Sequence, residues 1–163
     1  MPKTKIYCDS CVFLSYFNEE PTRIATLDDL FQEIDEDNNR ILLTSVLTLT
    51  EVAHLSIEKK RWRTIVNVEE RLDTFWGNHR LVEVVDFHPF IARSARNLMR
   101  AAINDRFSLG PADAIHLSTA EWAGATEFFT YDDLARFDKF VAFDIKLPYV
   151  LQPKLRGNDG QRI

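Results

Sequence analysis

Short apolar runs alternate along the chain with longer stretches of helical periodicity. The apolar runs are rich in residues that favour strands, and they cover residues 6–8, 41–44, 81–85, 128–131 and 140–145. Between them, apolar residues recur every three or four positions, as in helices. This pattern covers residues 12–17, 22–37, 90–103 and 111–122. It also covers a longer stretch that begins at residue 45 or 48, runs to residue 57 and continues to about residue 76. Strands that alternate with helices predict an α/β fold. We expect a three-layer α/β/α sandwich around a central, mainly parallel sheet of four or five strands.

The same pattern predicts a single domain. No repeat, low-complexity block or linker divides the 163 residues, and a hydrophobic fraction of 45% is enough to form a sizeable core without metals or disulfides. We therefore expect one domain over residues 1–150. Polar residues and glycines dominate the last segment, so we expect residues 151–163 to form a flexible tail.

The charge balance limits the classes of partner. There are 20 Lys and Arg against 25 Asp and Glu, which gives a net charge of −5. The broad basic surface that is usual in nucleic-acid binders is therefore missing, and such a partner would have to be bound locally. The sequence shows neither a secretory leader nor a run of 18 apolar residues, so we expect a cytoplasmic protein with no membrane contact.

The two cysteines, Cys8 and Cys11, form one C-x-x-C pair. Such a pair occurs in redox sites and as half of a zinc site. Zinc would need two further ligands, and the four histidines are scattered without a second paired spacing. Because Cys8 stands inside an apolar strand, we favour a structural role as a small hydrophobic residue.

Four carboxylates are candidates to meet at one edge of the sheet. Asp9 and Asp132 each follow a predicted strand directly, and the carboxyl ends of parallel strands form the edge where ligands bind in open α/β sheets. Asp113 lies in the first turn of a predicted helix, and Glu51 lies early in another; both helices begin at that edge. Each acid also has a purely structural interpretation: helix caps for Asp9 and Asp132, a favourable helix-dipole position for Asp113, and a Thr48-x-x-Glu51 capping box.

The four acids together favour a metal site. Two carboxylates about 5 Å apart repel by roughly 3 kcal/mol at an effective dielectric constant near 20, so a cluster needs protons or a cation. Oxygen ligands without a paired His or Cys set favour Mg²⁺ or Mn²⁺. These ions lower the pKa of water and neutralise charge on a phosphoryl group, which suits phosphodiester hydrolysis. Without the four acids the net charge would be −1, so the proposed site accounts for most of the acidity.

Four segments carry a resemblance to a known family. They are IYCDSCVF at 6–13, TEV at 50–52, PADAIHLSTA at 111–120 and FTYD at 129–132. In this order and at these spacings they resemble the PIN domain family and, more narrowly, the VapC-like toxins of type II toxin–antitoxin systems. The resemblance extends from about residue 5 to residue 147.

The resemblance implies an endoribonuclease that depends on Mg²⁺ or Mn²⁺. It assigns the metal-binding and catalytic positions to Asp9, Glu51, Asp113 and Asp132, with Asp133 as an alternative to the fourth. Ser10 matches the small hydroxyl residue that often follows the first acid. The implied partners are an RNA substrate, a protein antitoxin and a second copy of the chain in a homodimer, with exposed aromatics such as Trp62 or Trp76 as contact candidates.

Other charged residues have two interpretations. One predicted helix face carries Arg93, Arg96 and Arg100, and a basic run surrounds Trp62; either set could follow an RNA backbone, although we favour ordinary solvated faces. His116, one turn beyond Asp113, could lie near the site, but its apolar neighbours favour a hydrogen-bonded core histidine.

Three other functions remain as alternatives at this stage. They are a stand-alone RNA-processing PIN nuclease, a non-catalytic RNA-binding or protein-binding module of the same fold, and a receiver-like phosphoryl acceptor. The last of these needs a paired acid after the first strand, where this chain has Ser10 and Cys11.

Overall fold

A five-stranded parallel sheet forms the centre of the molecule. The computed structural model describes residues 2–151, so all of the expected tail except Leu151 lies outside the described residues. The strands lie in the order β3-β2-β1-β4-β5, and every neighbouring pair is parallel. Their bounds are β1 Thr4–Cys8, β2 Arg40–Ser45, β3 Val82–Val85, β4 Glu127–Phe129 and β5 Asp144–Lys146. The expected parallel α/β sheet is confirmed.

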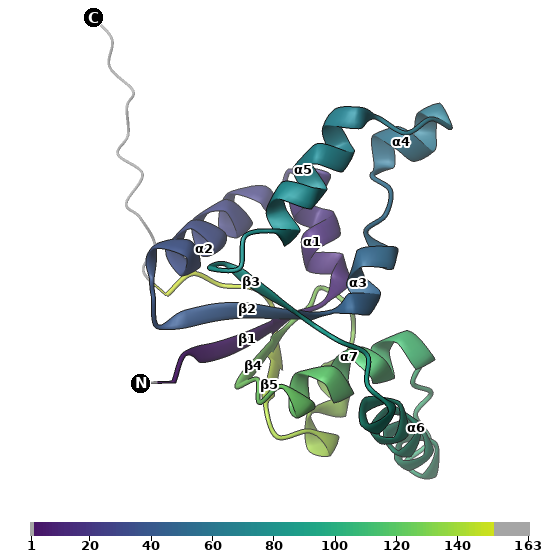
Figure 1. Cartoon of the computed structure of the whole chain (residues 1–163). Helices are drawn as coiled ribbons and strands as arrows, with labels where there is room; N and C mark the ends of the chain where they lie inside the picture. The colour runs from purple at the N-terminus through teal and green to yellow at the C-terminus, as the bar shows by residue number, and fades with distance from the viewer. Residues whose placement is uncertain (1, 152–163) are drawn as a thin grey trace, which may run out of the picture.

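Helices cover both faces of this sheet (Figure 1). The α-helices are α1 Ser10–Phe17, α2 Ile24–Glu36, α3 Val46–Glu51, α4 Ser56–Arg61, α5 Val66–Trp76, α6 Pro89–Asn104 and α7 Pro111–Trp122, and a 3₁₀ helix, η1, spans Ala135–Phe140. In Figure 1, α1, α2 and α5 lie above the sheet while α6 and α7 lie below it. No helix in the described part of the chain is long and apolar enough to cross a membrane.

Alternating side chains of the strands supply two separate cores. On β1, Ile6 and Cys8 pack with the layer of α1, α2 and α5, whereas Tyr7 between them packs with the layer of α6 and α7. This alternation is what a strand buried on both faces requires, and it explains the nearly continuous apolar sequence of β1 and β2. Both cysteines are free, and Cys8 is fully buried in the first core, as a structural role requires.

Three sequence predictions on element boundaries are wrong. The strand predicted at 128–131 is Glu127–Phe129, so Asp132 does not follow it directly. The helical stretch predicted from residue 45 or 48 to about 76 is divided into three helices, α3, α4 and α5. Glu58 accepts a hydrogen bond from the Leu55 backbone, which begins α4, and one from the Ile65 backbone, which fixes the turn into α5. The predicted strand at 140–145 begins only at Asp144. Residues 135–140 instead form η1, where Asp138 accepts a hydrogen bond from the Ile145 backbone.

Candidate functional site

Asp9 lies where β1 ends and α1 begins, and its side chain is held from two directions. The strand register aligns Cys8 with Phe129, so the residues that follow them, Asp9 and Thr130, are neighbours at the carboxyl edge of the sheet. The backbone N–H of Ser10 donates to Asp9 Oδ1 at 2.7 Å, and the Thr130 hydroxyl donates to Asp9 Oδ2 at 3.0 Å. Asp9 is therefore the helix cap that its position predicted, but its carboxylate is also only 2% exposed and fixed in orientation.

Asp132 stands beside this carboxylate. Its backbone N–H donates to the Thr130 hydroxyl at 3.0 Å, so one threonine positions both acids. One potential ligand atom from each of Asp9, Cys11 and Asp132 lies within 4.8 Å of the others. Asp133 differs, since its exposed carboxylate lies 3.9 Å from Arg136 in an ion pair. Asp132 does not cap a helix, because the N-cap of η1 is Leu134.

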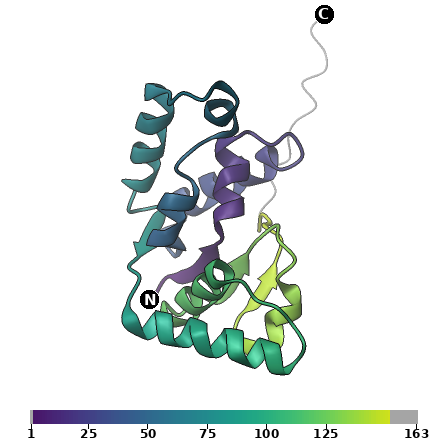
Figure 2. The same cartoon turned by 90° about the vertical axis from the view of Figure 1, so that its right-hand side faces the viewer.

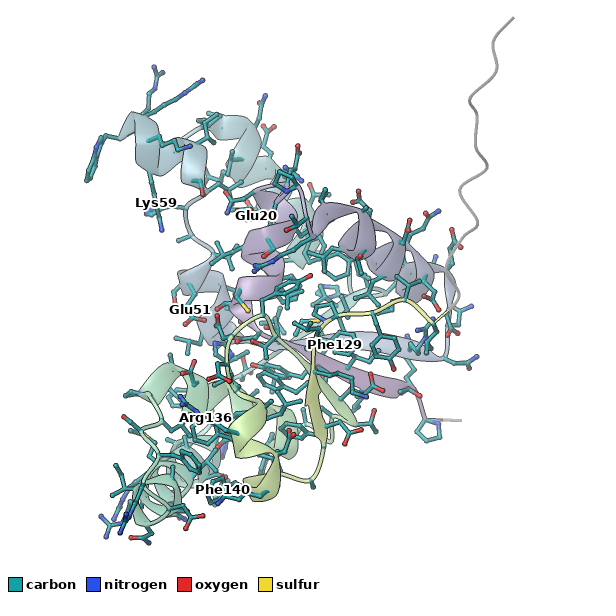
Figure 3. The ribbon with its side chains drawn as sticks, turned by 180° about the vertical axis from the view of Figure 1, so that it is seen from behind. Glu20, Glu51, Lys59, Phe129, Arg136 and Phe140 are labelled. Carbon is teal, nitrogen blue, oxygen red and sulfur yellow. The ribbon has the colours of Figure 1, made fainter. Side chains whose placement is uncertain are left out.

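Glu51 reaches the site through a histidine. It is the last residue of α3 rather than an early one, and Figure 3 shows it at the edge of the sheet, between the two helical layers. His116 Nε2 lies 2.7 Å from Glu51 Oε2 and 3.6 Å from Asp9 Oδ1. The capping-box interpretation of Glu51 is wrong, because Ser45 caps α3 and the Thr48 hydroxyl pairs with Thr44 instead.

His116 itself has a second partner in the core. The Tyr7 hydroxyl lies 2.8 Å from His116 Nδ1, and both side chains are almost wholly buried. A carboxylate can only accept, so His116 Nε2 donates to Glu51, and the Nδ1 of the neutral ring accepts from Tyr7. Burial works to lower the pKa of His116, but the Glu51 hydrogen bond and the charges of Asp9 and Glu51 outweigh it, and the pKa is raised.

Asp113 lies in the first turn of α7 and is half-buried. Burial raises its pKa, and the negative charges of Asp9, Asp132 and Glu51 raise it further. The charges of the other three candidate acids therefore act on Asp113, so the four carboxylates interact electrostatically. Asp113 does not cap its helix, since the N-cap is Gly110.

The electrostatics of the site are those of carboxylates short of positive charge. Burial raises the pKa of Asp9, and nearby Asp132 adds to that, although His116, Thr130 and Ser10 counteract them. Partial burial alone would raise the pKa of Glu51 as well. This pKa is lowered instead, because the hydrogen bond and charge of His116, together with a hydrogen bond from Ser10, outweigh the burial. Raised pKa values beside other acids mark a place where a cation would be bound favourably.

The donor set fits a hard divalent cation. Among the described residues, the soft donor grouped with Asp9 and Asp132 is Cys11, and burial, followed by the charge of Asp9, raises its pKa to about 12. Its thiol therefore stays protonated, and it donates to Asp9 Oδ2 at 3.7 Å. The donors left for a metal are carboxylate oxygens, which suit Mg²⁺ or Mn²⁺ better than zinc.

Sequence reasoning missed the parts played by His116 and Thr130. His116 is indeed a buried, hydrogen-bonded histidine, but one of its partners is the candidate acid Glu51, 65 residues away in the chain. The only signal for it in the sequence was its position three residues after Asp113 on the same helix. Thr130 carried no signal beyond its place at the end of a strand.

The comparisons with known proteins agree with this architecture. The PIN domain model matches residues 6–140. Among solved structures, a chain of VapBC2 from Rickettsia felis, bound to a promoter DNA fragment, has a TM-score of 0.68 at 14% identity and covers 88% of this chain and 98% of its own. VapC20 from Mycobacterium tuberculosis, described as a sarcin–ricin loop cleaving toxin, has a TM-score of 0.61 at 15% identity, covering 85% and 98%.

A third structure, FitAcB from Neisseria gonorrhoeae, has a TM-score of 0.63 at 21% identity and covers 88% of this chain and 97% of its own. No curated protein matches the chain significantly. At these identities the solved structures establish a shared fold, whereas the family model spans most of the sequence. The chain belongs to the PIN domain family.

Proposed function

We propose that this protein is an endoribonuclease dependent on Mg²⁺ or Mn²⁺ and that it is the toxin of a toxin–antitoxin pair. The observation that carries the proposal is the buried, doubly fixed carboxylate of Asp9 beside Asp132 at the carboxyl edge of a PIN-domain sheet. Capping of α1 accounts for Asp9 but not for the second acid beside it, because two neighbouring carboxylates repel. Such a pair is the arrangement that a metal site requires.

The residues of the proposed metal site have different tasks. Asp9 and Asp132 would hold the ion directly, and Asp113 and Glu51 would complete the set of oxygen ligands. When bound, Mg²⁺ or Mn²⁺ would supply a water of lowered pKa and neutralise the charge that builds up on the RNA phosphate. The protein's own contribution is orientation: Thr130 fixes Asp9, and His116 fixes Glu51.

RNA is the proposed substrate because of the family and one structural relative. VapC20, which shares this fold, is described as cleaving the sarcin–ricin loop. Burial raises the pKa of the Cys11 thiol to about 12, which makes it a poor nucleophile. We therefore propose hydrolysis by a water oriented between the carboxylates and the phosphate.

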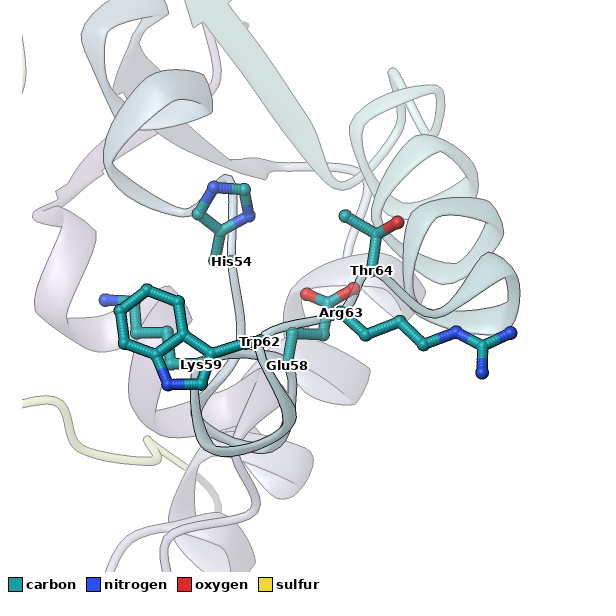
Figure 4. Close-up of a pocket in the computed structure, with 6 residues that line it drawn as sticks. All are labelled: His54, Glu58, Lys59, Trp62, Arg63 and Thr64. Carbon is teal, nitrogen blue, oxygen red and sulfur yellow. The ribbon is translucent and has the colours of Figure 1, made fainter.

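A protein antitoxin would bind the groove beside α3, α4 and α5. One hollow of about 410 Å³ is lined by apolar residues such as Leu49 and Trp76 and by charged ones such as Glu69. It shares His54 and Glu58 with a neighbouring hollow of about 510 Å³, where the indole of Trp62 lies at the rim (Figure 4). A concave surface with apolar side chains between polar ones suits the apolar face and the polar edges of an amphipathic helix. The VapBC and FitAB relatives are complexes, which supports such a partner, and we also propose that the chain forms a homodimer.

The test is cleavage of a labelled RNA by protein stripped with EDTA and then supplied with Mn²⁺ or Mg²⁺. We expect Asp9→Asn and Asp113→Asn to lower the cleavage rate by more than about 100-fold, since changes to residues that only support metal ligands already lower it by roughly 10- to 100-fold. Asp133→Asn is the matched control, because it removes one acid from the same region and should leave the rate unchanged. Full activity in Asp9→Asn and Asp113→Asn would refute the proposal.

A further inference from the structure

Three aromatic rings form an exposed stack at one end of α6 and α7. This aromatic platform consists of His88, Phe90 and Trp122, whose ring centroids lie 5.0 to 5.9 Å apart with planes inclined by 5° to 17°. Phe90 is 52% exposed and Trp122 is 58% exposed. Most large aromatic side chains of the protein are buried or partly buried, so a parallel stack left open to solvent is an unusual surface feature.

The platform is held in place by its own local contacts. His88 caps α6, and its Nδ1 accepts a hydrogen bond from the Phe90 backbone, which fixes the imidazole above the first turn. Trp122 is the last residue of α7, which packs along α6. The three rings are therefore already stacked before a ligand ring binds to them. This lowers the entropic penalty of binding.

An arginine stripe continues from the platform along α6. Arg93, Arg96 and Arg100 are exposed, and α6 contains no acidic residue in its 16 positions. None of the three forms an ion pair with a carboxylate in the described part of the chain. Arg93 lies 5.5 Å from the Phe90 ring, so the stripe and the platform are continuous. In a protein of net charge −5, this is a local concentration of positive charge.

We propose that the aromatic platform and the arginine stripe bind single-stranded RNA outside the cleavage site. Bases would stack on the rings while the arginines contact phosphates, the combination by which proteins bind single strands. The proposal rests on the function proposed above. Asp113 and Trp122 are nine residues apart on α7, or about 14 Å along its axis, so one strand of several nucleotides can reach both the acids and the platform. Figure 2 shows α6 along the outside of the molecule, where such a strand has access.

Charge favours RNA over a second copy of the chain as the occupant. A symmetric dimer through this face would bring the stripe of one copy against that of the other, with no acid on α6 to offset the repulsion. A polyanion that also presents flat rings matches both parts of the surface. The acids nearest the platform in the sequence are Asp86 and Glu121. Both precede the aromatic residues in the chain, and neither lies among the arginines of the stripe.

The test measures binding without cleavage. The full-length wild-type protein in EDTA is titrated into a fluorescein-labelled 12-nucleotide RNA, and anisotropy gives the dissociation constant. We expect Phe90→Ala and Trp122→Ala each to weaken binding by at least about fivefold, the lower end for one base–aromatic stack. Trp122→Phe should retain most of the wild-type affinity. Ile103→Ala, which shortens an exposed aliphatic side chain at the other end of α6, should leave the affinity unchanged. Replacing Arg96 by Gln should lower the salt slope by about 0.7.

Equal affinity of the two alanine variants and wild type would overturn the proposal. It would also be overturned if those variants altered the sedimentation coefficient but not RNA affinity, since the platform would then be a protein contact. A thermal melt of each variant checks the fold, and exposed positions should leave the midpoint nearly unchanged. Because binding is measured in EDTA, its outcome is independent of whether the acids cleave RNA: a failure of the platform leaves the dependence of cleavage on Asp9 intact, and a failure of cleavage leaves the binding result intact.

Discussion

The hydrogen-bonded chain from Tyr7 through His116 to Glu51 makes a prediction that separates stability from activity. Replacing His116 by Leu removes both of its hydrogen bonds while keeping a side chain of similar bulk in the core. The Tyr7 hydroxyl is fully buried, and leaving such a group without a partner costs about 1 to 3 kcal/mol.

The Glu51 side of the chain contributes little to stability. Its side chain is 27% exposed and can turn to water, so loss of this pair costs less than about 1 kcal/mol. Tyr7→Phe combined with His116→Leu removes both buried polar partners at once. We expect the double variant to lose about 1 kcal/mol less free energy of unfolding than the sum of the two single losses, as is typical of residues in contact.

Activity should follow a different order. Both variants that lack His116 release Glu51, and we expect a roughly 10- to 100-fold lower cleavage rate, as for other residues that orient metal ligands. Tyr7→Phe keeps the histidine beside Glu51 and should retain most of the rate. Urea unfolding in EDTA gives the stabilities, and initial rates at saturating Mn²⁺ give the activities. Wild-type rates in both His116→Leu variants would refute the positioning role, and strictly additive stabilities would refute the buried hydrogen bond.

Three further predictions concern other parts of the fold. Thr130→Val keeps the shape but removes the donor to Asp9, so cleavage should fall by roughly 10- to 100-fold in a rate assay, and the loss of a hydrogen bond to a buried carboxylate should cost about 1 to 3 kcal/mol of stability in urea unfolding. Phe128→Ala should destabilise the protein by about 3 to 5 kcal/mol in urea unfolding, because this ring is fully buried and stacks on Tyr7 and Phe143. Hydrogen bonds from the Ile65 and Leu55 backbones lower the pKa of Glu58, so its contribution to stability is present above pH 4.5 and lost as pH falls through the lowered pKa. Stabilities measured against pH should therefore show a wild-type advantage over Glu58→Gln at pH 7 that shrinks below about pH 4.5.

Hydrophobic periodicity was sufficient to predict the layers but not every boundary. The run around Phe140 to Ile145 is apolar enough for a strand. However, Phe137 within η1 is fully buried, and the Ile145 backbone N–H donates to Asp138 of the same helix, so the strand begins only at Asp144. Likewise, no local pattern shows that the region after Glu51 leaves the helix. That break depends on the two backbone bonds that Glu58 accepts from residues on either side of it.

The acids were predictable because parallel strands end at a common edge, whereas their supports were not. Asp9 follows β1 directly and Asp132 comes three residues after the end of β4, and topology brings such positions to a common edge. His116 and Thr130 act through contacts between segments 65 and 121 residues apart, and a single sequence gives no measure of such distances. The sequence favoured Asp132 and left Asp133 as an alternative. In the structure the two differ, because Asp132 shares Thr130 with Asp9 and Asp133 faces Arg136.

The neighbouring acids Asp132 and Asp133 provide the most direct test of the proposed metal site. The measurement is the initial rate of RNA cleavage as a function of Mn²⁺ concentration for wild type, Asp132→Asn and Asp133→Asn. We expect Asp132→Asn to need at least about tenfold more Mn²⁺ for half-maximal rate, while the Asp133→Asn curve coincides with that of wild type. Coincidence of all three curves, or a shift in Asp133→Asn alone, would contradict the account.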